Sequence, residues 1–217
     1  MFAAGLEGVE SFSGGSNRTI TFQPGGSVTI PCHYNEKYTL QKKYWYSDIN
    51  VSLKYTNTTE ENLTVIDHPD QSLFTVTMRN LQTNQAGKHH CAVETKENPH
   101  TYDCYLQVKA DSYVFVMNSS VSGHEGGNVS VQCFYSSGYQ NNTKRWCRYK
   151  DQRCFTEKTD TSQNPSVQIS DDGESSFTVL MTELRLSDSG WYFCSAGIHI
   201  FPVQLTLTKA ESERKQE

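Results

Sequence analysis

Short runs in which apolar and polar residues alternate recur along the whole chain. In Ser27–Tyr34, for example, Val28, Ile30 and Cys32 occupy every second position. Successive side chains of a β-strand point to opposite faces, so this alternation predicts strands with one buried face. Turn-forming sequences such as Pro24-Gly25-Gly26 separate the runs. The pattern predicts an all-β protein.

The alternation predicts a similar series of strands in each half of the chain. In the first half we expect strands at Thr19–Phe22, Ser27–Tyr34, Lys43–Tyr46, Leu63–Ile66, Leu73–Met78 and Tyr102–Val108. In the second half we expect them at Tyr113–Met117, Asn128–Tyr135, Lys144–Tyr149, Val167–Ile169, Ser175–Leu180, Gly190–Ala196 and Phe201–Thr208. The segment Asp48–Tyr55 is expected to form an extra pair of strands.

Each half also contains a cysteine, a tryptophan and a second cysteine at matching spacings. The two triads are Cys32, Trp45 and Cys91, and Cys133, Trp146 and Cys194. In both, the tryptophan follows the first cysteine by 13 residues. The second cysteine follows the first cysteine by 59 residues in one triad and by 61 in the other. This arrangement is typical of immunoglobulin-type β-sandwiches, in which a disulfide joins the two sheets and the indole fills the core beside it.

The two halves are internal repeats. Phe74, Val76 and Met78 alternate before the second cysteine as Phe177, Val179 and Met181 do. An offset of 101 to 103 residues indicates a duplication, and the 59-residue spacing favours the longer variable-type domain. We therefore predict two tandem V-type domains, residues 1–109 and 110–217. The linker Ala110-Asp111 is too short for a flexible tether, which predicts a restricted angle between the domains.

The corner before the second cysteine differs between the halves. In Asp188–Cys194, Tyr192 lies two residues before Cys194, where a tyrosine corner is expected to return its hydroxyl to nearby backbone. In the first half His89 occupies this position and Gln85 replaces the aspartate. An imidazole still donates a hydrogen bond, but we expect the first corner to be the weaker one.

Composition excludes several classes of function. The net charge is −5, and no basic run is present to track a phosphate backbone, so nucleic acid is not expected as a partner. No Gly-X-Ser-X-Gly elbow or glycine-rich phosphate loop is present, so we expect no enzyme, no catalytic residue and no cofactor. No stretch approaches the roughly 20 apolar residues of a membrane span. We expect an ectodomain whose start has been processed and whose charged tail, Glu211–Glu217, leads to a membrane anchor outside this sequence.

Seven cysteines and several glycosylation motifs indicate an extracellular location. The motif Asn-X-Ser/Thr begins at Asn17, Asn50, Asn57, Asn62, Asn118, Asn128 and Asn141. So many motifs in strand-rich sequence predict a cell-surface or secreted glycoprotein.

Three cysteines lie outside the two triads. Cys147 follows Trp146 and is expected to face outward, on the solvent side of its sheet, where a disulfide to Cys154 would join two strands of a hairpin. The alternative, a metal site, lacks four clustered ligands and a zinc-type spacing. Cys104 alternates with Leu106 on the inward face of a strand, so it is expected to be a buried free thiol; an intermolecular disulfide is the alternative.

Seven histidines raise the question of a metal site. His89 and His90 are neighbours on one strand and point to opposite faces. The others show no ligand spacing, and they are His33, His68, His100, His124 and His199. We expect structural roles for most of them and no bound metal.

Several segments resemble a known receptor family. Residues Lys144–Lys150 read Lys-Arg-Trp-Cys-Arg-Tyr-Lys, with Cys154 behind them. This is similar to the Lys-Tyr-Trp-Cys signature of the polymeric immunoglobulin receptors and the related CMRF-type leukocyte receptors. Gly26–Tyr34, Lys43–Trp45 and Asp67–Met78 match the same family. The resemblance covers residues 17–208, although the first domain has Tyr46 in place of the extra cysteine and so lacks the second disulfide.

With two such domains, the chain resembles the short polymeric immunoglobulin receptors of bony fishes. The resemblance implies a protein that binds polymeric immunoglobulin through first-domain loops and carries it across epithelia. The contacts it implies are Lys37, Tyr38, Thr39 and Lys42 in the first loop, then Lys54 and Tyr55, and then Lys96, Asn98 and His100. Tyrosine offers contact area at low entropic cost, and lysine offers electrostatic steering. The alternatives are a signalling leukocyte receptor for lipid or cell-surface ligands, a homophilic adhesion module, and a solvated loop without a partner.

Overall fold

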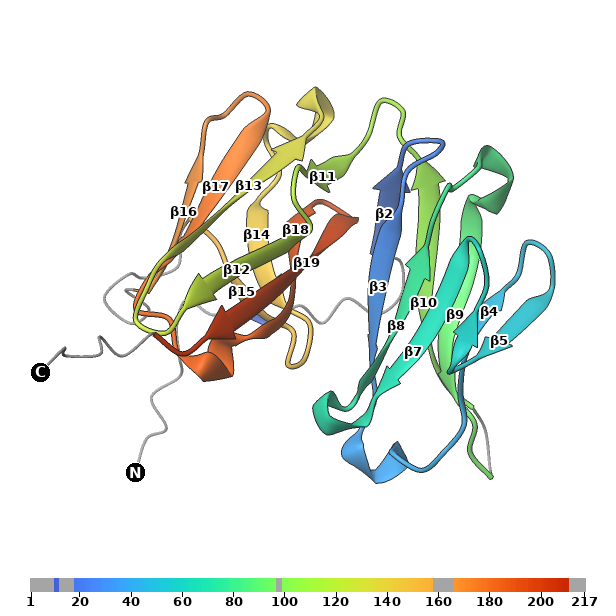
Figure 1. Ribbon diagram of the computed structural model, residues 1–217. Coiled ribbons are helices and arrows are strands. Elements are labelled where there is room, and N and C mark those ends of the chain that lie inside the picture. The colour runs from blue at the N-terminus through green and yellow to red at the C-terminus, as the bar shows by residue number, and fades with distance from the viewer. Residues whose placement is uncertain (1–9, 12–17, 97–98, 158–165, 211–217) are drawn as a thin grey trace, which may run out of the picture.

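The computed structural model describes residues 10–11, 18–96, 99–157 and 166–210. Its regular structure consists of β-strands and short 3-10 turns, which confirms the predicted all-β class. None of the helices in these ranges is long and apolar enough to cross a bilayer. We refer to residues 18–109 as the first domain and to residues 110–210 as the second (Figure 1).

The first domain is a sandwich of two sheets. One sheet contains, in order, β3 (Val28–His33), β8 (Leu73–Met78), β7 (Leu63–His68) and β6 (Thr58–Thr59). The facing sheet contains β2 (Arg18–Phe22), β10 (His100–Val108), β9 (Gly87–Val93), β4 (Lys43–Ser47) and β5 (Ser52–Tyr55). The disulfide Cys32–Cys91 joins the sheets, and Trp45 is buried between them.

The second domain repeats this plan. One sheet contains β11 (Val114–Val116), β13 (Val129–Tyr135), β17 (Ser176–Met181) and β16 (Val167–Asp171). The facing sheet contains β12 (Ser120–His124), β19 (His199–Thr208), β18 (Gly190–Ala196), β14 (Lys144–Arg148) and β15 (Arg153–Phe155). Strand β1 (Glu10–Ser11), which precedes the first domain in the sequence, pairs with β15 at the edge of this sheet. Cys133–Cys194 and Trp146 form its centre, and the Tyr192 hydroxyl donates to the Asp188 carbonyl at 2.7 Å.

Several details differ from the predicted strands, among them β1, which lies in a segment where no strand was predicted. Asp48–Tyr55 holds one strand, β5, rather than a pair, because the chain turns between β4 and β5 with Val51 in a left-handed conformation (φ 54°). The next strand along the chain, β6, pairs with β7 in the other sheet. The strand β12 was not predicted, since its residues alternate between exposed and half-buried positions without an apolar face.

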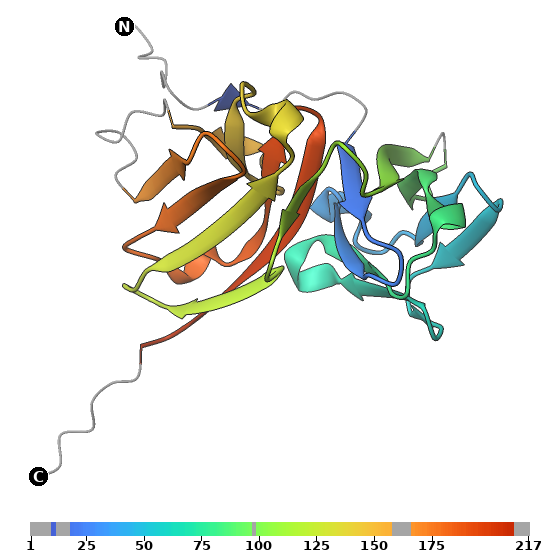
Figure 2. The ribbon, with the colours of Figure 1, turned by 90° about the horizontal axis from the view of Figure 1, so that it is seen from above.

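The two domains lie side by side and share one sheet (Figures 1 and 2). Strand β19 of the second domain pairs in parallel with β2 of the first, with Ile200 opposite Ile20. The Thr21 hydroxyl donates to the Val114 carbonyl at 3.0 Å, and the Lys109 ammonium lies 4.2 Å from the ring centroid of Tyr113. Pairing and side-chain contacts therefore restrict the angle between the domains.

The contact between the domains corrects one prediction. The disulfide Cys147–Cys154 is present, but both residues are 0% exposed, so Cys147 does not face solvent. Its side of the sheet points away from the core of the second domain, as alternation predicts. That side packs instead against the first domain: Cys147, Tyr149 and Phe193 belong to the same hydrophobic cluster as Ile20.

Candidate ligand-binding loops of the first domain

The first loop connects β3 and β4 and has a defined conformation. It begins with a 3-10 turn, Glu36–Tyr38. The Asn35 side chain caps this turn by accepting a hydrogen bond from the Lys37 amide at 3.1 Å. The Thr39 hydroxyl donates to the Glu36 carbonyl at 2.6 Å and closes the other end. Side chains that satisfy the ends of a turn hold it in one conformation.

A buried lysine anchors the loop from below. The ammonium of Lys43, a residue 1% exposed, donates to the Thr39 carbonyl at 2.6 Å and to the Asp67 carboxylate at 2.9 Å. The Tyr34 hydroxyl donates to the other Asp67 oxygen at 2.8 Å, and the ammonium lies 4.4 Å from the Tyr34 ring centroid. Burial and the neighbouring carboxylate both raise the pKa of Tyr34. The loop is thus tied to the β-sandwich and is preorganised for contact.

The second domain contains the same anchor. Lys144 donates to the Asp171 carboxylate at 2.7 Å and to the Gln140 carbonyl at 3.0 Å, and Tyr135 donates to Asp171 at 2.5 Å. Burial acts to raise the pKa of Asp171, but the donors Lys144 and Tyr135 lower it overall. This motif was not among the predicted features. Its signal is a lysine two residues before each core tryptophan and a tyrosine two residues after the first cysteine of each triad.

The first loop presents aromatic and cationic side chains together. The Lys37 ammonium lies 4.8 Å from the ring centroid of Tyr38, and the Lys42 ammonium lies 5.8 Å from that of Tyr55 on β5. Leu40, at the end of the loop, is 97% exposed. Leu40 was not predicted as a contact, because an isolated apolar residue in a loop carries no periodic signal. Tyrosine is enriched at protein-binding surfaces, so Tyr38 and Tyr55 are the side chains here that favour such a surface.

A cavity of about 290 Å³ lies under this loop. Asn35, Lys37 and Tyr38 line it from the first loop, and Val93 and Thr101 line it from the strands that flank the third loop. The cavity therefore brings the first and third predicted contact regions together.

The remaining predicted contacts are distributed differently. Lys54 forms an ion pair with Glu60 at 2.5 Å and lines a separate cavity of about 460 Å³ with Asn50 and Asn62, so it points away from Tyr55. Lys96 is exposed in the third loop. Asn98 lies outside the described residues, and His100 begins β10 with a side chain that is not described.

All predicted glycosylation sites in the described ranges are exposed at the asparagine. These are Asn50, Asn57, Asn62, Asn118, Asn128 and Asn141, whereas Asn17 lies outside those ranges. Exposure of the amide is a requirement for glycan attachment.

The histidines and the free cysteine outside the loops lie in packed or hydrogen-bonded positions. Among the described residues, no group of three or more His, Cys, Asp or Glu side chains is placed to hold a metal ion. His89 faces the core and stacks on Trp45, whereas His90 faces outward between Asp48 and Asp103. Cys104 is buried as a free thiol, and burial raises its pKa to about 12.

Comparison with known proteins identifies the family. The immunoglobulin V-set domain model matches residues 15–109 and 116–208. The solved ectodomain of a teleost fish polymeric immunoglobulin receptor is 34% identical, over 89% of this chain and 97% of that one, with a TM-score of 0.45. The rat polymeric immunoglobulin receptor is 25% identical over 85% of this chain, and mouse CMRF35-like molecule 6 is 33% identical over 51% of it and 52% of that protein. The chain spans about a quarter of the length of the rat receptor (26%).

From these matches, the chain belongs to the immunoglobulin V-set family and, within it, to the group formed by the polymeric immunoglobulin receptors and the CMRF35-like molecules.

Proposed function

We propose that this chain is the ligand-binding ectodomain of a cell-surface receptor that binds polymeric immunoglobulin for transport across epithelia. The observation that carries the proposal is the first loop of the first domain, which Lys43 anchors while Lys37 and Leu40 are exposed and Tyr38 is half-buried. We propose polymeric immunoglobulin as the ligand because the similar receptors are named for it. The work of the chain is recognition of a protein, without covalent chemistry.

The loop suits this role for energetic reasons. A rigid loop loses little conformational entropy on binding, so more of the contact energy contributes to affinity. Tyrosines supply contact area, and the lysines attract acidic patches on a partner. We propose Lys37, Tyr38, Thr39 and Lys42 as the main contacts, with Tyr55, Lys96, Asn98 and His100 around them. Lys54 is the weakest candidate, because Glu60 already pairs with it.

The same proposal includes location and modification. We propose an extracellular position, an anchor in a segment outside this sequence, N-glycans on the exposed motifs, and a division into domains 1–109 and 110–217. Disulfides in both domains and six exposed motifs support an oxidising, secretory route.

The decisive experiment compares polymeric and monomeric immunoglobulin of the same species on the surface-captured ectodomain. We expect the polymer to bind more tightly than the monomer. Absence of binding to either form, with the disulfides shown to be intact, would contradict the proposal.

The second candidate is a signalling leukocyte receptor for lipid head groups or cell-surface ligands. Similarity to mouse CMRF35-like molecule 1, at 43% identity over 81 residues, favours it. Binding of the ectodomain to anionic phospholipid vesicles, together with no preference for polymeric immunoglobulin, would favour this candidate over transport.

A further inference from the structure

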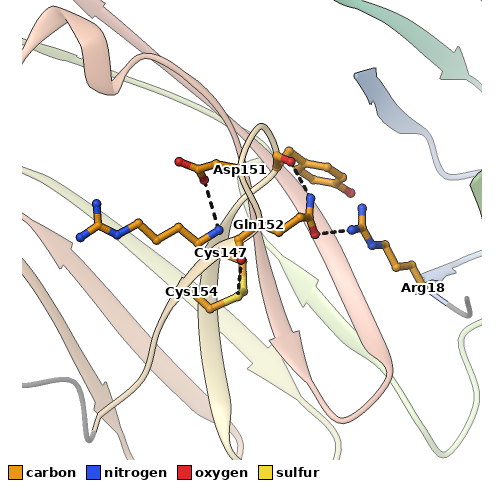
Figure 3. The surroundings of a disulfide bond; sticks show 7 residues. Arg18, Cys147, Asp151, Gln152 and Cys154 are labelled. Atoms are coloured by element: carbon orange, nitrogen blue, oxygen red, sulfur yellow. Dashed lines mark hydrogen bonds between the residues drawn. A yellow bond between two sulfur atoms is a disulfide. The ribbon is translucent and has the colours of Figure 1, made fainter. Parts of the chain in front are cut away.

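The hairpin closed by Cys147–Cys154 carries a turn, Tyr149–Gln152, that contacts the first domain (Figure 3). We call this segment the docking turn. Arg18 of β2 extends across the interface and donates to the Gln152 side chain, which in turn donates to the Tyr149 carbonyl (Figure 3). The Arg18 guanidinium lies 5.6 Å from the ring centroids of both Tyr149 and Phe193. The disulfide therefore supports the part of the second domain that holds the first.

His33 lies between the docking turn and the ligand loop. Its ring stacks on Tyr149 with the centroids 6.0 Å apart and the planes 16° apart. On its other side, His33 lines the cavity under the loop together with Asn35 and Tyr38. Its Nδ1 atom is buried and has no hydrogen-bond partner within the described part of the chain. The position suits a neutral ring, because a proton on this buried atom would have no hydrogen-bond acceptor among the described residues.

The charged groups around His33 are mostly cations. Arg18 acts on it from β2, Arg148 from β14 and Lys150 from the docking turn, while Asp151 is the opposing anion. Burial is the largest effect, followed by these cations, and together they lower the pKa of His33 to about 4. A proton on His33 would place another positive charge among Arg18, Arg148 and Lys150.

A second histidine on the same interface is buried. His199 of β19, which is 3% exposed, bonds through Nε2 to the Gln107 side chain of the first domain at 3.1 Å. Because the Gln107 oxygen only accepts, Nε2 donates, and Nδ1 accepts from the Tyr139 hydroxyl. The ring is therefore neutral with its proton on Nε2. A second proton would leave the bond to Gln107 in place but would remove the acceptor of the Tyr139 hydroxyl and put a charge on a buried ring. Burial lowers the pKa of His199 as well.

We propose that the two domains form an acid-sensitive clamp, in which neutral His33 and His199 hold the second domain against the first and protonation of these histidines separates the docking turn from the ligand loop. Because the pKa of His33 is lowered in the docked state, its neutral ring stabilises docking above about pH 6.5. This stabilisation is lost as the pH falls toward about 4. Protonation of His33 therefore weakens docking between about pH 7.4 and about pH 5. His199 acts in the same direction.

Opening of the clamp also changes the ligand site. Tyr149 supports His33, and His33 forms a wall of the cavity under Tyr38. Separation of the domains removes that support, so the first loop loses part of its preorganisation. We expect weaker ligand binding at acidic pH; this consequence rests on the proposed function, whereas the opening itself does not.

Small-angle X-ray scattering of the whole chain tests the opening without a ligand. We expect the radius of gyration to rise reversibly between about pH 7.4 and about pH 5. The double variant His33→Phe/His199→Gln, which keeps a ring on Tyr149 and a donor toward Gln107, should remain compact at both values. His124→Gln, at an exposed histidine away from the interface, is the matched control and should open like the wild type. A wild type that does not expand, or a double variant that expands equally, overturns the proposal.

A second measurement keeps the test independent of the variants. Thermal unfolding at neutral pH shows whether the double variant folds. If it does not, hydrogen exchange of the wild type decides: after correction for intrinsic rates, acid should increase exchange in β2 and the docking turn more than in β13 and β17. Equal changes in all four segments overturn the clamp. Loss of immunoglobulin binding at neutral pH would refute the proposed function and leave the clamp standing.

Discussion

His89 stacks on Trp45 in the first domain as Tyr192 stacks on Trp146 in the second. The ring centroids are 5.1 Å apart in both pairs, and the planes meet at 13° and 8°. The His89 Nε2 atom also reaches the Gln85 carbonyl at 3.0 Å, which lies where the corner bond of a tyrosine would end. The first domain thus keeps the geometry of a tyrosine corner with a titratable ring.

This relationship predicts a change in acid stability. Burial lowers the pKa of His89, so the native ring is neutral, while the unfolded chain binds a proton below about pH 6.5. Its contribution to the free energy of unfolding is complete above that value and is lost as the pH falls. We expect His89→Tyr to reduce the acid sensitivity of the first domain and to add about 1 kcal/mol at about pH 5. Urea unfolding of the wild type and the variant at neutral pH and at about pH 5 measures this. The same pH dependence of the free energy of unfolding in both proteins would contradict the prediction. His124→Tyr is the exposed control.

The buried lysine under the ligand loop predicts a large loss of stability. Lys43→Met removes the partner of Asp67 and leaves the Thr39 carbonyl without its donor. Removing one partner of a buried pair costs about 3 kcal/mol. Lys54→Met breaks the partly exposed pair with Glu60 and should cost less than about 1 kcal/mol. Chemical unfolding followed by tryptophan fluorescence compares the two variants, and equal losses would show that Lys43 is not an anchor.

The free thiol predicts a simple chemical titration. Cys104 is 4% exposed, and burial raises its pKa to about 12, so the reactive thiolate is scarce at neutral pH. We expect no reaction with an aromatic disulfide reagent in the native protein and one thiol per chain after denaturation. Reaction in the native state would show that Cys104 is accessible. No thiol after denaturation would show that it is paired with another molecule.

The ligand loop predicts a localised loss of binding. Tyr38→Ala should weaken binding of polymeric immunoglobulin by at least about 1 kcal/mol, and Leu40→Ala should also weaken it, as expected of central contacts. Ile198→Ala removes an exposed apolar side chain of the second domain and serves as the control. Affinity is measured on captured protein at neutral pH. If neither loop variant changes it, the first loop is not part of the site.

Much of the fold could be predicted because its signals are local or covalent. Alternation along a strand shows which side chains share a face, and the Cys-Trp-Cys spacing shows which strands a disulfide joins. The presence of the first loop, between Cys32 and Trp45, followed from the same spacing. The anchor Lys43–Asp67 was also visible in principle, through its repetition as Lys144–Asp171, but only as a pair distant in sequence.

The sequence by itself thus determined two V-type sandwiches, their core disulfides and the end of the first domain that carries its loops. Only the tertiary structure decided what lies on the outer faces of those sandwiches. Cys147 alternates with the core residue Trp146, and alternation shows that such a side chain points away from its own core, but not whether water or another domain covers it. Packing between the domains joins Cys147, Tyr149 and Ile20 in one cluster and stacks His33 on Tyr149. The sequence did not reveal this, because contacts between distant segments leave no periodic trace in the chain.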